Sequence, residues 1–142
     1  MLTAFTALTV FSDCAAVRGY LYRYPACRHR ETKRGHVRLR ALWNEGAAFD
    51  LPIPKEVLRL GSAAALGAVW VNRLRWCPIG AGLILGGGLS NLSERVLWGR
   101  VFDYVQFPKA LGPLRRYVFN LADLSILAGG VLCLAAAGRE PS

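Results

Sequence analysis

The sequence predicts a mainly α-helical, polytopic membrane protein with four transmembrane helices and a small extracytoplasmic lobe of β or extended structure. Two observations carry this prediction. The 142 residues are 54% hydrophobic with a mean hydropathy of +0.29, which is high for a soluble domain of this size. The apolar residues also gather in four blocks, as in membrane proteins. The length suits one domain, so we expect residues 1–142 to form a single membrane domain.

The first apolar block covers about residues 2–21 and is interrupted by Asp13 and Arg18. A signal peptide would carry a basic segment before its apolar core and a small-residue cleavage site after it. This block has neither feature. We therefore expect it to be retained as the first membrane helix.

The other three blocks cover about residues 57–75, 77–93 and 118–137, and all are rich in glycine and alanine. A membrane-spanning helix needs roughly 17–25 residues, which each block reaches. Small residues allow helix backbones to approach closely, so a compact four-helix bundle is predicted. The run "GAGLILG" at 80–86 does not match a dinucleotide-binding loop, because its glycine spacing is wrong and no strand–loop–helix unit surrounds it.

Residues 22–54 are expected to form the lobe, because short apolar pieces there are separated by glycine and proline. The lobe includes the basic run "CRHRETKRGHVRLR" at 27–40, which contributes to the formal net charge of +9. Such a run is most often a solvated loop, and contact with anionic lipid headgroups is the alternative. No aromatic residues alternate with its cations, so we expect no nucleic-acid partner.

The four cysteines predict neither a metal site nor a disulfide. No two of them form a C-x-x-C pair, and neither histidine lies at metal-ligand spacing from them. Three of the cysteines lie in apolar stretches, where a free thiol behaves as a small apolar side chain.

Two acidic residues lie where polarity is expensive. Asp103 follows the third block and Asp123 lies near the start of the fourth. Ionisable groups at membrane depth are usually functional. Two close carboxyl groups share one proton and can divide the acid and base roles around a water molecule, which suits peptide hydrolysis. Alternatively, Asp123 caps the fourth helix and Asp103 pairs with Arg95 or Arg100.

Three motifs surround these aspartates. The stretch "GGGLSNLSERVLWGRVFDY" at 86–104 contains Asn91, Arg95 and Asp103, "FNLAD" at 119–123 contains Asn120 and Asp123, and "NEGAAF" at 44–49 begins with Asn44. In their residues, their order and their place between the expected helices, these motifs resemble the lipoprotein signal peptidase (signal peptidase II) family. The resemblance covers the chain from about residue 44 to its end.

The resemblance implies an aspartyl endopeptidase that cleaves diacylglyceryl-modified prolipoproteins just before the lipidated lipobox cysteine. It implies no metal or organic cofactor. The expected partners are these substrates and membrane lipids, and a monomer is expected in the bacterial inner membrane. Asp103 and Asp123 would be catalytic, whereas the residues that bind substrate or support the pair would be Asn44, Asn91, Glu94, Arg95, Asn120 and Asp13.

The same resemblance implies that both termini are cytoplasmic and that the lobe lies outside. The charge distribution favours the opposite orientation, because the two longer connections hold more Lys and Arg than the short one at 73–76. The three ordered motifs are the more specific signal, so we expect the family orientation.

The chain departs from the family pattern at three places. Glu94 stands where the family has Asp, and Ser90 stands where the family has Gly. In its first helix the family usually has an Asp followed four residues later by a Lys, whereas this chain has Asp13 followed by Val17. Arg18 comes one position later, which turns its side chain by about 100° on a helix, so the sequence leaves open whether it replaces that Lys. Glu94 and Arg95 are expected to form a local ion pair. A family member that binds lipidated peptides without cleaving them is therefore an alternative, and a basic membrane-surface protein is a third.

Overall fold

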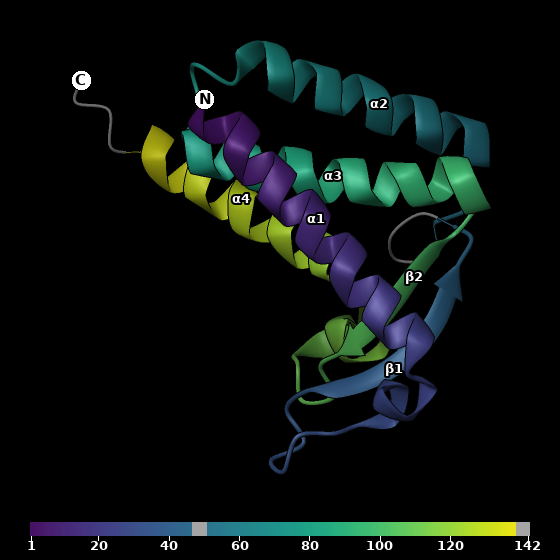
Figure 1. Cartoon of the computed structure of the whole chain (residues 1–142). Coiled ribbons are helices and arrows are strands. Elements are labelled where there is room, and N and C mark those ends of the chain that lie inside the picture. Colours follow the sequence, from purple (N-terminus) through teal and green to yellow (C-terminus); the bar gives the residue numbers. More distant parts are fainter. Residues whose placement is uncertain (47–50, 139–142) are drawn as a thin grey trace.

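The computed structural model describes residues 1–46 and 51–138. Four long helices and a three-stranded sheet are present in this part of the chain (Figure 1). The elements are, in order, α1 (Leu2–Arg23), η1 (Pro25–His29), β1 (Arg38–Asn44), α2 (Lys55–Asn72), α3 (Pro78–Trp98), β2 (Val101–Gln106), η3 (Gly112–Arg116), β3 (Val118–Phe119) and α4 (Leu121–Ala137). The prediction of a mainly helical fold with a small sheet is confirmed.

Helix α3 lies at the centre of the bundle and packs against α1, α2 and α4. Its glycines make this possible. A Cβ on Gly86 would lie 2.5 Å from the carbonyl oxygen of Ala7, and a Cβ on Gly87 would lie 2.5 Å from that of Ala122. Since real Cβ atoms do not approach so closely, only glycine allows α1 and α4 to touch this face of α3. In α2, by contrast, a Cβ added to Gly61 or Gly67 would meet no atom within 4 Å outside the helix's own nearby backbone.

The sheet lies at the end of the bundle where α1 and α3 finish, and α4 runs away from it (Figure 1). β1 and β3 each pair antiparallel with the central strand β2. Two of the three strands therefore come from the connection between α3 and α4. The prediction that residues 22–54 alone would form the lobe missed this contribution.

Two helix boundaries differ from the predicted blocks for local reasons. Helix α3 continues past residue 93 to Trp98 and ends at Gly99, whose left-handed backbone (φ 69°) suits glycine. Helix α4 begins at Leu121, because Val118 and Phe119 pair with β2 and Asn120 caps the helix. The predicted fourth block therefore contains a strand, a cap and a helix.

Within residues 1–46 and 51–138, none of the helices combines the length and apolar character that a membrane crossing requires. The membrane-spanning role of the four helices stays a prediction. The four cysteines are free thiols.

Candidate active site

The two predicted catalytic aspartates lie on different elements at the sheet end of the bundle. Asp103 is in the middle of β2, opposite Leu42 of β1, and is only 4% exposed. Asp123 lies in the first turn of α4 and is half-buried. The turn at Gly99 reverses the chain after α3, so that β2 carries Asp103 back beside the start of α4.

Asn120 connects the two aspartates. Its Nδ2 donates to Oδ1 of Asp103 at 2.9 Å and to Oδ1 of Asn91 at 2.9 Å. Its Oδ1 accepts the backbone N–H of Asp123, while Oδ2 of Asp123 accepts the backbone N–H of Asn120. These reciprocal bonds form a capping box. Asp123 therefore takes part in capping α4, as the alternative held, although the N-cap residue is Asn120, and the same bonds hold its carboxyl group within the site.

Two further asparagines complete the hydrogen bonding of the carboxyl groups. Nδ2 of Asn91 donates to Oδ1 of Asp123 at 2.8 Å, and Nδ2 of Asn44 donates to Oδ2 of Asp103 at 3.1 Å. Each of the four carboxyl oxygens thus accepts one N–H. The structure brings together Asn44, Asn91, Asp103, Asn120 and Asp123 from four different elements, as a shared site requires.

The environment of Asp103 favours its protonated form. Burial and, after it, the nearby charge of Asp123 raise the pKa of this carboxyl group from 3.8 to about 7. Hydrogen bonds from Asn44 and Asn120 and the charge of Arg95 act in the opposite direction. Near neutral pH, Asp103 can therefore hold the proton that a pair of carboxyl groups must share.

The alternative that Asp103 forms an ion pair with Arg95 or Arg100 is wrong for the described part of the chain, where its partners are the two amides. The guanidinium of Arg100 lies over the ring of Trp43 instead, 4.3 Å from its centroid. Arg95 makes only long hydrogen bonds, from Nη1 to the carbonyl oxygen of Asn91 at 3.5 Å and from Nη2 to that of Gly46 at 3.4 Å.

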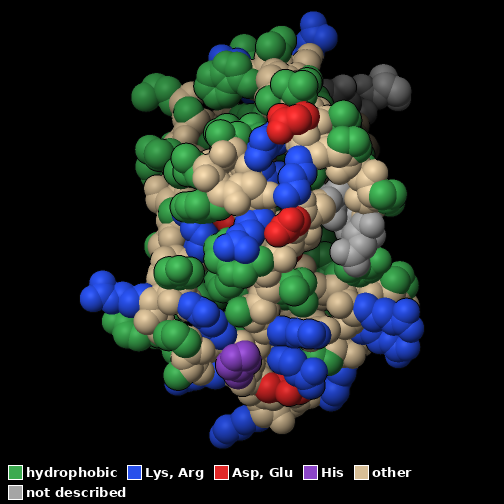
Figure 2. All heavy atoms as spheres, turned by 90° about the vertical axis from the view of Figure 1, so that its right-hand side faces the viewer, with side chains coloured by type: hydrophobic (Ala, Val, Ile, Leu, Met, Phe, Trp, Pro, Cys, Tyr) green, Lys and Arg blue, Asp and Glu red, His purple; other side chains and the backbone are tan. Residues whose placement is uncertain are grey.

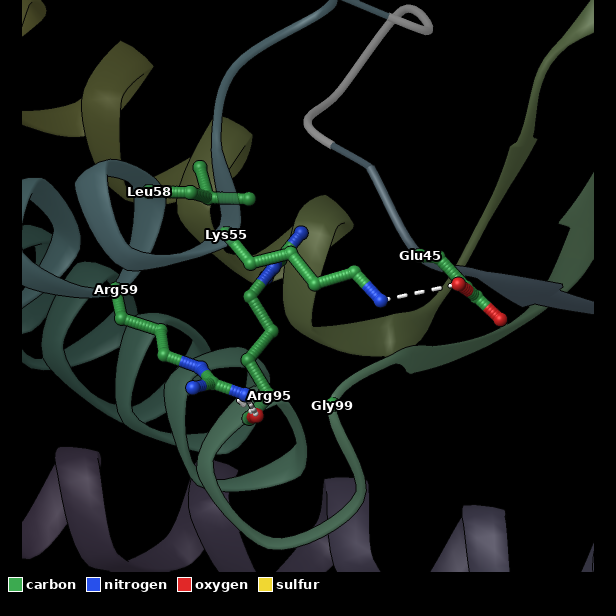
Figure 3. A pocket seen from close by; sticks show the side chains of 6 residues that line it. All are labelled: Glu45, Lys55, Leu58, Arg59, Arg95 and Gly99. Atoms are coloured by element: carbon green, nitrogen blue, oxygen red, sulfur yellow. Dashed lines mark hydrogen bonds and ion pairs between the residues drawn. The ribbon is translucent and has the colours of Figure 1, made fainter.

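Arg95 lines a small polar pocket with Glu45, Lys55, Leu58, Arg59 and Gly99 (Figure 3). Arg59 of α2 points to the end of α3 and donates from Nε and Nη2 to the carbonyl oxygen of Arg95, at 3.1 and 2.8 Å. On the other side, Lys55 forms an ion pair with Glu45 at 3.0 Å. The guanidinium of Arg95 is thus left at the edge of the site with weak partners.

Glu94 pairs with Arg18 and not with Arg95, so the expected local pair is wrong. Oε1 of Glu94 lies 2.7 Å from Nη1 of Arg18, and Oε2 accepts the backbone N–H of Phe102 at 2.9 Å. Arg18, whose role the sequence left open, therefore reaches Glu94 from one position after the place of the family's Lys. Glu94 is 4% exposed, so this network joins α1, α3 and β2 in the interior.

The remaining residues that the sequence analysis named form no hydrogen bond or ion pair with the two aspartates in the described part of the chain. Asp13 is exposed on α1 and makes no hydrogen bond or ion pair with the cluster in the part of the chain that the structure describes. Ala47, Ala48 and Phe49 of the "NEGAAF" motif lie outside the described residues. Ser90 is 1% exposed, and its hydroxyl interacts with the Cys14 thiol.

Sequence reasoning missed two supporting residues, Arg59 and Tyr104, and left the role of Arg18 open. The Tyr104 hydroxyl accepts the backbone N–H of Leu121 at 3.1 Å and so fixes the start of α4 against β2. The run "VFDYVQ" after Gly99 is rich in β-branched and aromatic residues, which is the signal that could have identified this strand. No local pattern marks Arg18 or Arg59, because their partners are distant in sequence.

The described residues contain no group of three or more His, Cys, Asp and Glu side chains that could hold a metal ion. The chemistry available to the site is that of two carboxyl groups surrounded by amide donors. One group can hold a proton while the other remains ionised, which is the requirement for activating a water molecule and protonating a carbonyl or amide group.

An apolar groove of about 590 Å³ opens beside this network, between α1, α4 and the sheet. It is lined by Ala16, Val17, Tyr20, Leu21, Leu39, Tyr104, Val105, Leu121 and Leu124. Tyr104 and Leu121 directly follow Asp103 and Asn120 in the sequence, so the groove adjoins the backbone that carries the site.

Residues 6–138 match the family described as Signal peptidase (SPase) II. A lipoprotein signal peptidase of Nitrobacter hamburgensis is 39% identical over 103 residues, and one of Methylorubrum extorquens is 37% identical over 100 residues. These alignments cover 65% and 63% of this chain, and 63% and 57% of the two relatives. The chain thus spans about three fifths of the length of the curated relatives that it matches.

A solved structure described as a bacterial membrane enzyme has a similar fold. The TM-score is 0.81 at 20% sequence identity, and the match covers 98% of this chain and 94% of the other.

Proposed function

The chain belongs to the signal peptidase II family, and we propose that it is an aspartyl endopeptidase that removes the signal peptide from diacylglyceryl-modified prolipoproteins just before the lipidated cysteine. One observation carries the proposal. Asp103 and Asp123, from separate elements, are hydrogen-bonded to the same asparagine, Asn120. The relatives named lipoprotein signal peptidase support the substrate class.

In the proposed reaction the two carboxyl groups act around one water molecule. Asp103 carries the proton, since burial and the charge of Asp123 favour that form. Asp123 accepts a proton from the water molecule, and the water oxygen attacks the scissile carbonyl carbon. At the same time, Asp103 gives its proton to the carbonyl oxygen. Collapse of the tetrahedral intermediate then breaks the C–N bond. The amine of the lipidated cysteine leaves with the proton held by Asp123, while a hydroxyl of the intermediate returns a proton to Asp103 as the new carboxyl group forms. No metal is needed for these steps.

The supporting residues have separate roles in this proposal. Asn44, Asn91 and Asn120 orient the two carboxyl groups, and Glu94 positions β2 through the Phe102 N–H. Arg95 has weak internal partners, which leaves its guanidinium able to bind substrate carbonyl oxygens. The apolar groove beside the site offers a volume of about 590 Å³ to an acyl chain. Asp13 stays a predicted supporting residue.

We also propose that the chain is a single multi-pass domain of the bacterial inner membrane and acts as a monomer. Large apolar side chains on the outer faces of the helices support a lipid environment. They include Phe5 (70% exposed) and Leu8 on α1, Leu60 and Val71 on α2, Val96 and Leu97 on α3, and Leu127 and Leu134 (76% exposed) on α4. With both ends of the chain inside, the sheet and the two aspartates would face the outer side of the membrane.

A cleavage assay tests the proposed reaction. The purified chain, reconstituted in lipid, is incubated with a prolipoprotein that carries the diacylglyceryl group, and the products are separated on a gel. A matched substrate has serine in place of the lipobox cysteine and therefore no lipid. We expect release of the signal peptide from the lipidated substrate alone. Equal cleavage of both substrates would contradict the proposed substrate class, and binding without cleavage would favour the non-catalytic alternative.

A further inference from the structure

The positive charge of the chain is concentrated in the sheet lobe, which we define as residues 23–46 and 99–120. These segments hold eleven of the 18 Lys and Arg but only three of the nine Asp and Glu. They therefore account for a surplus of eight positive charges, out of a formal net charge of +9 for the whole chain. Figure 2 shows Lys and Arg side chains gathered over this lower part of the molecule, below a surface with more hydrophobic side chains.

Most of the Lys and Arg side chains of the lobe form no ion pair or hydrogen bond with another described residue. Arg38 pairs with Glu31, Lys109 donates to the carbonyl oxygen of Arg34, and Arg28 donates to the last carbonyls of α1. The guanidinium of Arg100 lies over the ring of Trp43. The other exposed cations make no hydrogen bond or ion pair through their side chains within residues 1–46 and 51–138: Arg23, Arg30, Lys33, Arg34, Arg40, Arg115 and Arg116. Since no described residue takes their donors, these side chains can bind an external anion.

The position of the surplus positive charge indicates which kind of anion the lobe binds. Exposed aromatic side chains lie at the boundary between the apolar helix surfaces and the lobe: Tyr20, Tyr22 and Tyr24 at the end of α1, and Trp98 at the end of α3. Tyrosine and tryptophan at such a boundary are typical of the headgroup level of a bilayer. In the proposed membrane location, cations next to this boundary would lie at the height of lipid phosphates, within the range over which an anionic surface attracts them.

We infer that the sheet lobe is a docking surface for the headgroups of anionic phospholipids, which hold the active-site end of the protein against the membrane surface. The inference rests on the proposed membrane location and extends it to lipid selectivity. Nucleic acid is disfavoured, because no aromatic side chain is interleaved with the cations of residues 28–40.

The test measures lipid preference directly and does not depend on cleavage. The full chain is reconstituted in phosphatidylcholine bilayers with a trace of spin-labelled phosphatidylglycerol or spin-labelled phosphatidylcholine. Electron paramagnetic resonance then gives the relative association of each lipid with the protein. We expect phosphatidylglycerol to be preferred several-fold at low salt, and this preference to decrease with added NaCl because exposed charges are screened.

Matched variants locate the preference. K33Q/R34Q and R115Q/R116Q each remove two exposed lobe charges, whereas R73Q/R75Q removes two charges at the short connection between α2 and α3. Each lobe cation near the surface contributes at most about a fivefold preference. We expect both lobe variants to lose a large part of the preference and the control to keep it, with melting temperatures near that of the wild type.

Two results would overturn the inference: no preference for phosphatidylglycerol in the incorporated protein, or a preference that only R73Q/R75Q removes. Tighter binding of a single-stranded oligonucleotide than of phosphatidylglycerol vesicles would assign the lobe to nucleic acid instead. If the chain does not enter bilayers at all, the proposed membrane location fails, which is distinct from failure of the lipid preference.

Discussion

The guanidinium of Arg18 lies 2.7 Å from the carboxylate of Glu94, and this ion pair joins α1 to α3 next to the strand that carries Asp103. The second oxygen of Glu94 accepts the backbone N–H of Phe102, the residue before Asp103. Both members of the pair differ from the family pattern, since Glu replaces Asp in α3 and the cation is displaced by one residue in α1. The long side chains of Glu94 and Arg18 form a buried pair between the two helices.

This pair predicts an unequal effect of single and double substitutions. R18M leaves the 4%-exposed Glu94 with a buried, uncompensated charge, which costs about 3 kcal/mol or more. R18M/E94Q removes that charge while keeping an acceptor for the Phe102 N–H, so it should recover much of the lost stability. Thermal melting in detergent checks this, and a double variant that is less stable than R18M would refute the proposed coupling.

Asn120 is predicted to have two separable roles, as the cap of α4 and as the link between the aspartates. N120A removes both and should lower stability by about 1 kcal/mol in addition to reducing cleavage. Serine is an equally good cap but lacks the amide donor, so N120S should keep a near-native melting temperature and still lose cleavage. Full activity of N120S would show that the amide link is dispensable.

The raised pKa of Asp103 predicts a pH dependence of both rate and stability. Cleavage should fall as the pH rises through about 7, because the pair loses its shared proton. The folded-state pKa lies above the unfolded value of 3.8, so the folded state binds more protons between these limits. Stability should therefore decrease from about pH 4 to pH 7. The melting temperature of D103N should not show this decrease between pH 4 and pH 7. If D103N keeps the pH dependence of the wild type, Asp103 is not the group with the raised pKa.

Two glycines provide a matched test of the helix packing that positions Asp123. A Cβ on Gly87 would lie 2.5 Å from the carbonyl oxygen of Ala122, whereas Gly130 has no neighbouring atom within 4 Å. G87A should displace α4 from α3, lower the free energy of unfolding by about 1–3 kcal/mol and reduce the cleavage rate. G130A should be neutral or stabilise slightly, because alanine is the better helix former. Melting temperature and cleavage rate distinguish the two, and equal behaviour would argue against close packing at Gly87.

The motifs around the two aspartates were sufficient to predict which residues meet, because each combines a chemically distinctive side chain with a fixed spacing. Asn91, Asp103, Asn120 and Asp123 lie together in the structure as the sequence analysis expected. The four helices were also predictable, because long apolar blocks leave few alternative structures.

The sheet and the ion pairs were harder to predict, because they depend on partners distant in sequence. β2 needed β1, 57 or more residues earlier in the chain, to be recognised as a central strand. The partner of Glu94 lies 76 residues away, so its immediate neighbour Arg95 was the natural but incorrect choice.

The most direct test of the central claim compares D103N and D123N with the wild type in the cleavage assay on lipidated prolipoprotein. E31Q is the matched control, since it neutralises an acidic residue on the exposed surface of the lobe. The account predicts that each aspartate variant lowers the cleavage rate by about 10³-fold or more while still binding the substrate, and that E31Q cleaves at the wild-type rate. Cleavage by either aspartate variant at a rate near that of E31Q would contradict the claim that these two carboxyl groups carry out the reaction.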